Sequence, residues 1–212
     1  MNKQNEQLEA LTEIRSLMER SSRFISLSGL SGVFAGVFAL IGIGAAYNFL
    51  NLKIGEPTSF ESAIDLDGNL STELFSFFFA DAICVLLASL AVGSFLTMRK
   101  AKQKDLPIWD STAKRLLINL ILPLIVGGLF CLILINHGFI TLIAPTMLLF
   151  YGMALLNASK YTLNDIRFLG ICEMVLGLLA ALYINHGLLF WAIGFGVLHI
   201  IYGTVMYYKY EK

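Results

Sequence analysis

The sequence has little charge, little cysteine and little proline. Only 14% of its 212 residues are Asp, Glu, Lys or Arg, and 15 cations balance 15 anions. A soluble domain carries about 25% charged residues, so this composition argues against a soluble globular protein. The net charge is zero, so the chain lacks the excess of basic residues that a nucleic-acid-binding surface needs. We therefore expect no nucleic acid partner.

The sequence also lacks the spacing of metal ligands and the motifs of catalysis. Cys84, Cys131 and Cys172 each lie inside an apolar run, without a CxxC pair or a nearby histidine at ligand spacing. Free cysteine packs as a small hydrophobic residue. We find no Ser/His/Asp set and no nucleotide-binding loop. We therefore predict no metal, no cofactor, no catalytic residues and no enzymatic activity.

Hydrophobic residues are abundant, at 57% of the chain, and they lie in long runs. A helix needs about 20 mostly apolar residues to cross a bilayer core of about 30 Å. Two runs are divided only by Asn-His-Gly, whose Asn and Gly favour the backbone that ends a helix. We predict an all-α integral membrane domain at 24–212, with an outer loop at 51–73 and six spans at about 24–50, 74–98, 116–135, 138–156, 166–184 and 188–208.

Residues 1–23 have a different pattern, with apolar side chains on one face of a helix and mixed charges elsewhere. The mixed charges argue against a helix that lies on anionic lipid. We predict a cytoplasmic amphipathic helix that packs on the ends of the bundle or on its copy in a dimer. The apolar run that follows is too long for the core of a signal peptide, so we expect the first span to remain in the mature protein.

The positive charges predict the orientation of the chain. In the predicted topology, Lys53 is the one Lys or Arg of the 15 that lies on the outer side. Because Lys and Arg are retained on the cytoplasmic side, both termini are expected there, in a bacterial-type inner (plasma) membrane.

The predicted spans also suggest an internal repeat of three tandem hairpins. Ile-Asn-His-Gly occurs at Ile135–Gly138 and again at Ile184–Gly187, each time after a span that contains a central glycine. The stretch Leu169–Lys209 resembles the HdeD-like short-repeat membrane proteins through Leu176-Gly177-Leu178, Gly194, Gly196 and Tyr202-Gly203. That resemblance implies a six-helix inner-membrane protein of a family associated with acid stress, and it transfers no catalytic residues.

Three ionisable residues lie at membrane depth: Asp81, Glu173 and His199. Such groups are costly in hydrocarbon and usually have a partner or a task. The fifth and sixth spans form an antiparallel pair, so Glu173 and His199 are expected at matching depth, within hydrogen-bonding reach. They form either a proton-responsive pair, because histidine titrates near neutrality, or a polar clamp that fixes helix packing.

Two further features concern packing. Small residues form a face on the first span, which predicts close contact with a helix of the same chain or, in a homo-oligomer, of a second copy: Ser28, Gly32 and Gly36, with Ser31, Ala35 and Ala39 beside them. Pro123 and Pro145 lie in the third and fourth spans and predict kinks, which either frame a cavity or only bend the helix.

These observations favour a multi-pass membrane protein, surrounded by the lipid bilayer, with a structural, stress-related or interaction role. The alternative is a small transporter or proton-linked channel that uses Glu173, Asp81 and His199. The two hypotheses differ in whether Glu173 faces a polar cavity or is sealed by apolar neighbours.

Overall fold

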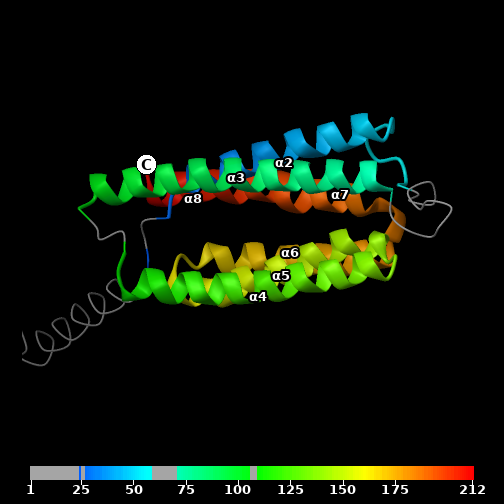
Figure 1. Ribbon diagram of the computed structural model, residues 1–212. Coiled ribbons are helices and arrows are strands. Elements are labelled where there is room, and N and C mark those ends of the chain that lie inside the picture. The colour runs from blue at the N-terminus through cyan, green and yellow to red at the C-terminus, as the bar shows by residue number, and fades with distance from the viewer. Residues whose placement is uncertain (1–23, 25–26, 59–70, 106–108) are drawn as a thin grey trace, which may run out of the picture.

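The computed structural model describes residues 24, 27–58, 71–105 and 109–212, and within them the chain is all-α (Figure 1). The predicted amphipathic helix at 1–23 and most of the loop at 51–73 lie outside the described residues. The helices are α2 (Gly29–Phe49), α3 (Thr72–Gln103), α4 (Ser111–Asn136), α5 (Ile143–Ala158), α6 (Asp165–Leu182), α7 (Gly187–Trp191) and α8 (His199–Tyr210). Short 3₁₀ turns flank α5 and precede α7, and a π-helix, Ala192–Leu198, joins α7 to α8.

Most of these helices are suited to a membrane. Among the described residues, five helical segments are long and apolar enough to cross one: Gly29–Phe49, Thr72–Gln103, Ser111–Asn136, Ile140–Tyr161 and Ile184–Tyr210. The chain is therefore a multi-pass membrane protein. The remaining long helix, α6, is 18 residues long and carries Asp165, Arg167 and Glu173.

The helices form two layers (Figure 1). One layer contains α2, α3 and the α7–α8 segment, in which α2 packs on both α3 and α8. The other contains α4, α5 and α6, in which α5 packs on both of its neighbours. The predicted third hairpin is therefore open, because α6 packs mainly on α5 whereas α8 packs mainly on α2.

Glycines explain which helices pair. A Cβ added to Gly36 of α2 would lie 2.6 Å from the carbonyl oxygen of Gly196, and one added to Gly203 would lie 2.6 Å from the amide nitrogen of Val33. Membrane helices associate by close packing of small residues, so these positions select the π-helix and α8 as the neighbours of α2. Gly32 and Gly36 of the predicted small-residue face thus pack against helices of the same chain.

The first span begins later than predicted. The helix starts at Gly29, where the carboxylate of Glu211 accepts hydrogen bonds from the Gly29 amide at 2.5 Å and from the Ser28 hydroxyl at 3.2 Å. Phe24 instead pairs with the connection between α5 and α6, donating its amide to the Tyr161 carbonyl at 2.7 Å. A carboxylate at a helix N-terminus satisfies free amides and favours the helix dipole, which explains the start at Gly29.

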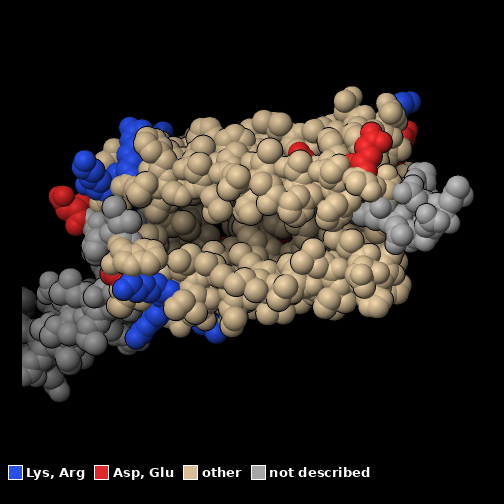
Figure 2. All heavy atoms as spheres, in the orientation of Figure 1, with Lys and Arg blue, Asp and Glu red and all other residues tan. Residues whose placement is uncertain are grey.

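The layers are tightly joined at one end of the bundle. Lys and Arg gather at this end, which we call the basic end (Figure 2). Here Asp165 of α6 accepts hydrogen bonds from Lys209 and Tyr210 of α8. Close by, apolar side chains of both layers form a buried cluster that contains Leu155, Leu163, Ile166, Leu169 and Met206. The basic end of the boundary between the layers is therefore closed by both polar and apolar contacts.

Candidate intramembrane site

Glu173 of α6 and His199 of α8 meet across the boundary between the two layers. The His199 Nδ1 atom lies 3.5 Å from the Glu173 Oε1 atom. Glu173 is completely buried and His199 is 7% exposed. The structure thus brings together the two residues that the sequence placed at matching depth.

Tyr151 of α5 is a third member of the site. Its hydroxyl lies 2.7 Å from His199 Nε2, while His199 Nδ1 lies 2.9 Å from the carbonyl oxygen of Gly194. A carbonyl oxygen only accepts, so Nδ1 carries a hydrogen, and the Tyr151 hydroxyl donates to Nε2 when the ring is neutral. Both ring nitrogens are satisfied. Tyr151 was not predicted from the sequence, although its polar hydroxyl within an apolar run was a usable indication.

The Glu173 carboxyl group, in contrast, has no hydrogen-bond partner for either oxygen within the described part of the chain. Its Oε2 atom lies against Gly194, where an added Cβ would approach it to 2.5 Å. An unpaired buried charge is very costly, so the Glu173–His199 pair must be close to neutral overall. Two arrangements satisfy this: glutamic acid beside neutral imidazole, or glutamate beside imidazolium.

The backbone next to the site is a π-helix. The segment Ala192–Leu198 contains Gly194 and Gly196 and ends immediately before His199. The carbonyl oxygen of Gly194, in this segment, accepts the hydrogen bond from the side-chain Nδ1 atom of His199. Single π-helical turns within α-helices are uncommon and occur often at functional sites. The sequence pattern did not predict this turn.

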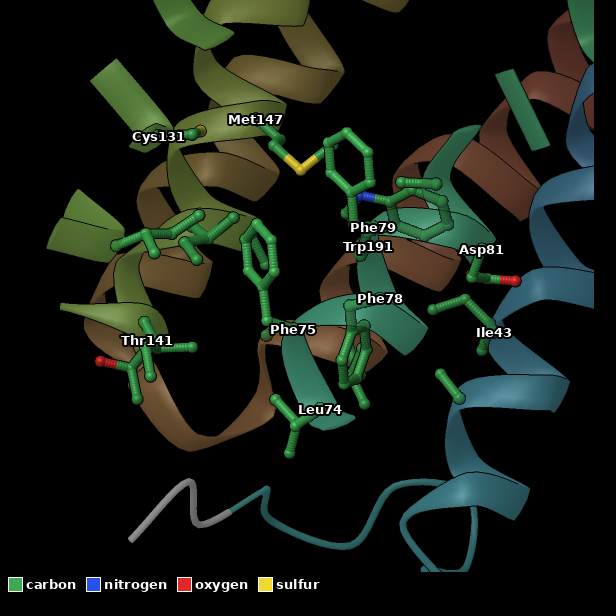
Figure 3. Close-up of a pocket in the computed structure, with 18 of the residues that line it drawn as sticks. Ile43, Leu74, Phe75, Phe78, Phe79, Asp81, Cys131, Thr141, Met147 and Trp191 are labelled. Carbon is green, nitrogen blue, oxygen red and sulfur yellow. The ribbon is translucent and has the colours of Figure 1, made fainter. Parts of the chain in front are cut away.

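Asp81 lies apart from this pair. It belongs to α3, and a Cβ added to Gly42 of α2 would lie 3.0 Å from its Oδ2 atom. Its carboxylate points toward α2 (Figure 3). Among the described residues, Asp81 has no hydrogen bond or ion pair with Glu173 or His199, so the three predicted site residues do not form one cluster.

A cavity of about 300 Å³ lies between the layers, nearer to the end opposite the basic end. Its walls come from both layers and include Phe75, Phe79, Met147 and Trp191 (Figure 3). Glu173 and His199 do not line it. Aromatic rings lie between the cavity and the pair: Trp191 contacts Phe195 at 4.7 Å between ring centroids, and Phe195 contacts Tyr151 at 4.9 Å.

The two prolines do not line this cavity either. Pro123 lies inside α4, whereas Pro145 is the third residue of α5 and is buried. In the first turn of a helix, a missing amide hydrogen removes no intrahelical bond. Pro145 is therefore compatible with the start of α5.

No match was found among protein-family models, curated proteins or solved structures. The resemblance to the HdeD-like short-repeat proteins and the expected lack of enzymatic activity stay predictions.

Proposed function

We propose that the chain is a small proton-linked membrane transporter, with the Glu173–His199 pair as its proton-binding group. The observation that carries this proposal is the Glu173 carboxyl group, which is completely buried and has no hydrogen-bond partner for either oxygen within the described residues. A polar clamp stabilises a fold when its groups are satisfied, and a partly satisfied buried network is worse than an apolar core. The unsatisfied carboxyl group favours a functional role for Glu173, whereas its separation from the cavity favours a structural one.

The position of the pair links its protonation to the contact between the layers. Glu173 and Tyr151 belong to one layer and His199 belongs to the other. A proton added to or removed from the pair changes its net charge, and therefore changes the attraction between α6 and α8. The other titratable contacts between these two helices are Cys172 with Tyr202, and Asp165 with Lys209 and Tyr210.

The orientation is part of the proposal. α5 ends at the basic end and α7 begins at the opposite end, so α6 runs the length of the bundle between them (Figure 1). We infer that α6 is a sixth span, shielded by α5, and that its buried Glu173 faces the interior. The gathering of Lys and Arg at one end supports cytoplasmic termini in a bacterial-type inner membrane.

Proton flux into proteoliposomes under an imposed pH gradient tests the proposal. We compare the native protein with Glu173→Gln, and with Glu73→Gln as a matched control in the exposed first turn of α3. The proposal predicts flux in the native protein and in the control, and loss of flux in Glu173→Gln. Equal flux in all three proteins, or none above empty liposomes, would contradict it.

A structural, stress-related or interaction role is the second candidate. The observation that favours it is the separation of Glu173 from the cavity, with Gly194 and Leu148 close to it instead. The resemblance to a family associated with acid stress also supports this role. A structural role predicts that Glu173→Gln changes the free energy of unfolding. It also predicts that neither the native protein nor the Glu173→Gln protein conducts protons.

A further inference from the structure

The cavity between the layers has a mostly apolar lining. Besides Asp81, its polar lining residue is Thr141, and the oxygens of both side chains point away from the aromatic residues at its centre (Figure 3). Its volume of about 300 Å³ is at the lower end of the usual range for small-molecule sites, which is about 300–1,000 Å³. The side chains that define it include Phe75, Phe78, Phe79, Met147 and Trp191.

Helices α3 and α4 both line the cavity, with Phe75 and Phe79 from α3 and Cys131 and Ile135 from α4. These helices follow one another in the chain but belong to different layers, and each packs on another neighbour: α3 on α2, and α4 on α5. A hollow is visible along the boundary between the layers on the face that α3 and α4 form (Figure 2). Both helices expose large apolar side chains along their length, including Leu86 and Leu87 of α3 and Leu129 of α4. The hollow therefore faces hydrocarbon rather than water when the chain is in a bilayer.

The lining determines what fills such a space. Water needs hydrogen-bond partners and does not favour an apolar cavity, and an empty cavity is destabilising. The medium outside the hollow consists of acyl chains, which match a lining that is mostly aromatic and aliphatic. We propose that the cavity binds an acyl chain of a bilayer phospholipid, which enters laterally between α3 and α4. This inference does not depend on proton transport.

Tryptophan fluorescence tests the site directly, because the chain has two tryptophans. Trp191 lines the cavity, whereas Trp109 lies in the exposed connection before α4. In a Trp109→Phe protein, Trp191 is the remaining tryptophan. We reconstitute this protein in phosphatidylcholine with brominated acyl chains, which quench tryptophan on contact, and compare it with unbrominated lipid.

Two substitutions separate a chain inside the cavity from lipid outside the protein. Ala82→Phe adds a ring to the α3 wall of the cavity, whereas Ala80→Phe makes the same change at an exposed position of α3 outside the lining. The proposal predicts strong quenching of Trp191 that is mostly lost with Ala82→Phe and kept with Ala80→Phe. Equal quenching in both variants would overturn it. Quenching that responds to Ala82→Phe only with a brominated free fatty acid, and not with the phospholipid, would overturn the assignment to phospholipid.

A second measurement uses the native chain and so does not depend on the folding of a variant. A phosphatidylcholine with a photoreactive group in its acyl chain is crosslinked in the bilayer, and the modified residues are identified by mass spectrometry. The proposal predicts adducts on lining residues that lipid outside the protein reaches least, at the buried Ile43 or the half-buried Met147 and Trp191. Adducts confined to the outward residues Leu86, Leu87 and Leu129 would contradict it.

Discussion

His199 and Glu173 face each other across the boundary between the two layers, with 3.5 Å between Nδ1 and Oε1. Both ring nitrogens of the histidine are hydrogen-bonded, whereas the buried carboxyl group has no hydrogen-bond partner within the described residues. This asymmetry separates the pair from an ordinary buried salt bridge, in which the remaining lone pairs are satisfied by further hydrogen bonds.

The hydrogen bond between Tyr151 and His199 should contribute measurably to stability. Tyr151→Phe removes the hydroxyl that contacts Nε2 but keeps the ring that packs on Phe195. We expect the free energy of unfolding in detergent to fall by about 1 kcal/mol, the usual contribution of one hydrogen bond. Tyr183→Phe, at an exposed position, is the control and should change little. Equal effects of the two substitutions would show that the hydroxyl does not stabilise the site.

Gly194 should tolerate no larger side chain. A Cβ there would lie 2.5 Å from both Glu173 Oε2 and Leu148 Cδ2, so Gly194→Ala should lower the free energy of unfolding by about 1–3 kcal/mol, as overpacking does. Gly44→Ala is the matched control, because nothing lies within 4 Å of the added Cβ. It should be neutral or stabilising by up to about 1 kcal/mol through helix propensity. Thermal unfolding of both variants in detergent compares them, and a neutral Gly194→Ala would mean that Glu173 does not lie against that glycine.

Glu211 should stabilise the fold through the start of α2. Its carboxylate accepts from Ser28, from the Gly29 amide and from the buried Lys100 ammonium, at 3.3 Å for the last. Hydrogen bonds to charged groups contribute about 1.5–3 kcal/mol, so we expect Glu211→Gln to cost an amount of this order. A double-mutant cycle with Lys100→Met should give a positive coupling energy.

The pair of Lys209 and Asp165 provides the comparison for that cycle. The Lys209 side chain is 53% exposed, so Lys209→Met should cost less than Glu211→Gln, and the cost should shrink in high salt. Chemical denaturation at low and high salt measures the cost of the substitution and its dependence on salt. A larger cost for Lys209→Met than for Glu211→Gln would contradict the larger contribution that we expect from Glu211.

The proposed sixth span predicts that the two ends of α6 lie on opposite sides of the membrane. In a protein without Cys84, Cys131 and Cys172, cysteine is introduced at Lys160, before α6, or at His186, after it. A membrane-impermeant thiol reagent added to intact cells should label the His186→Cys protein and leave the Lys160→Cys protein unlabelled until the cells are opened. Labelling of both proteins in intact cells would mean that α6 does not cross.

Local patterns in the sequence predicted much of the helical structure, whereas the long-range packing of the helices was harder to predict. Apolar runs and the two Asn-His-Gly sequences located the helices to within a few residues in most cases, because span length is a local property. The predicted left-handed backbone occurs at Gly138, with φ +76°, but not at Gly187, which has a helical φ of −52° and begins α7. The start of α2 was misplaced because Glu211, at the other end of the chain, determines it. The opening of the third hairpin was also missed, since nearly identical apolar helices are distinguished by a few glycine contacts such as that of Gly36 with Gly196.

The residues of the candidate site likewise include some that the sequence predicts and some that depend on long-range packing. Glu173 and His199 were predicted together because helix connectivity fixes their relative depth. Asp81 was grouped with them on residue type alone, and the structure places it against α2. Tyr151 and the π-helix were missed, because their importance depends on the pairing of helices from the two layers.

The central claim is that Glu173 exchanges a proton within the folded membrane protein. Infrared difference spectroscopy of reconstituted protein tests it most directly, by recording the carbonyl stretch of a protonated carboxylic acid at low and high pH. Our account predicts a carboxylic acid band that changes with pH, is absent in Glu173→Gln and shifts in His199→Gln. A spectrum without any pH-dependent band attributable to Glu173 would mean that the carboxyl group keeps one protonation state, and that the pair is a structural contact between the layers.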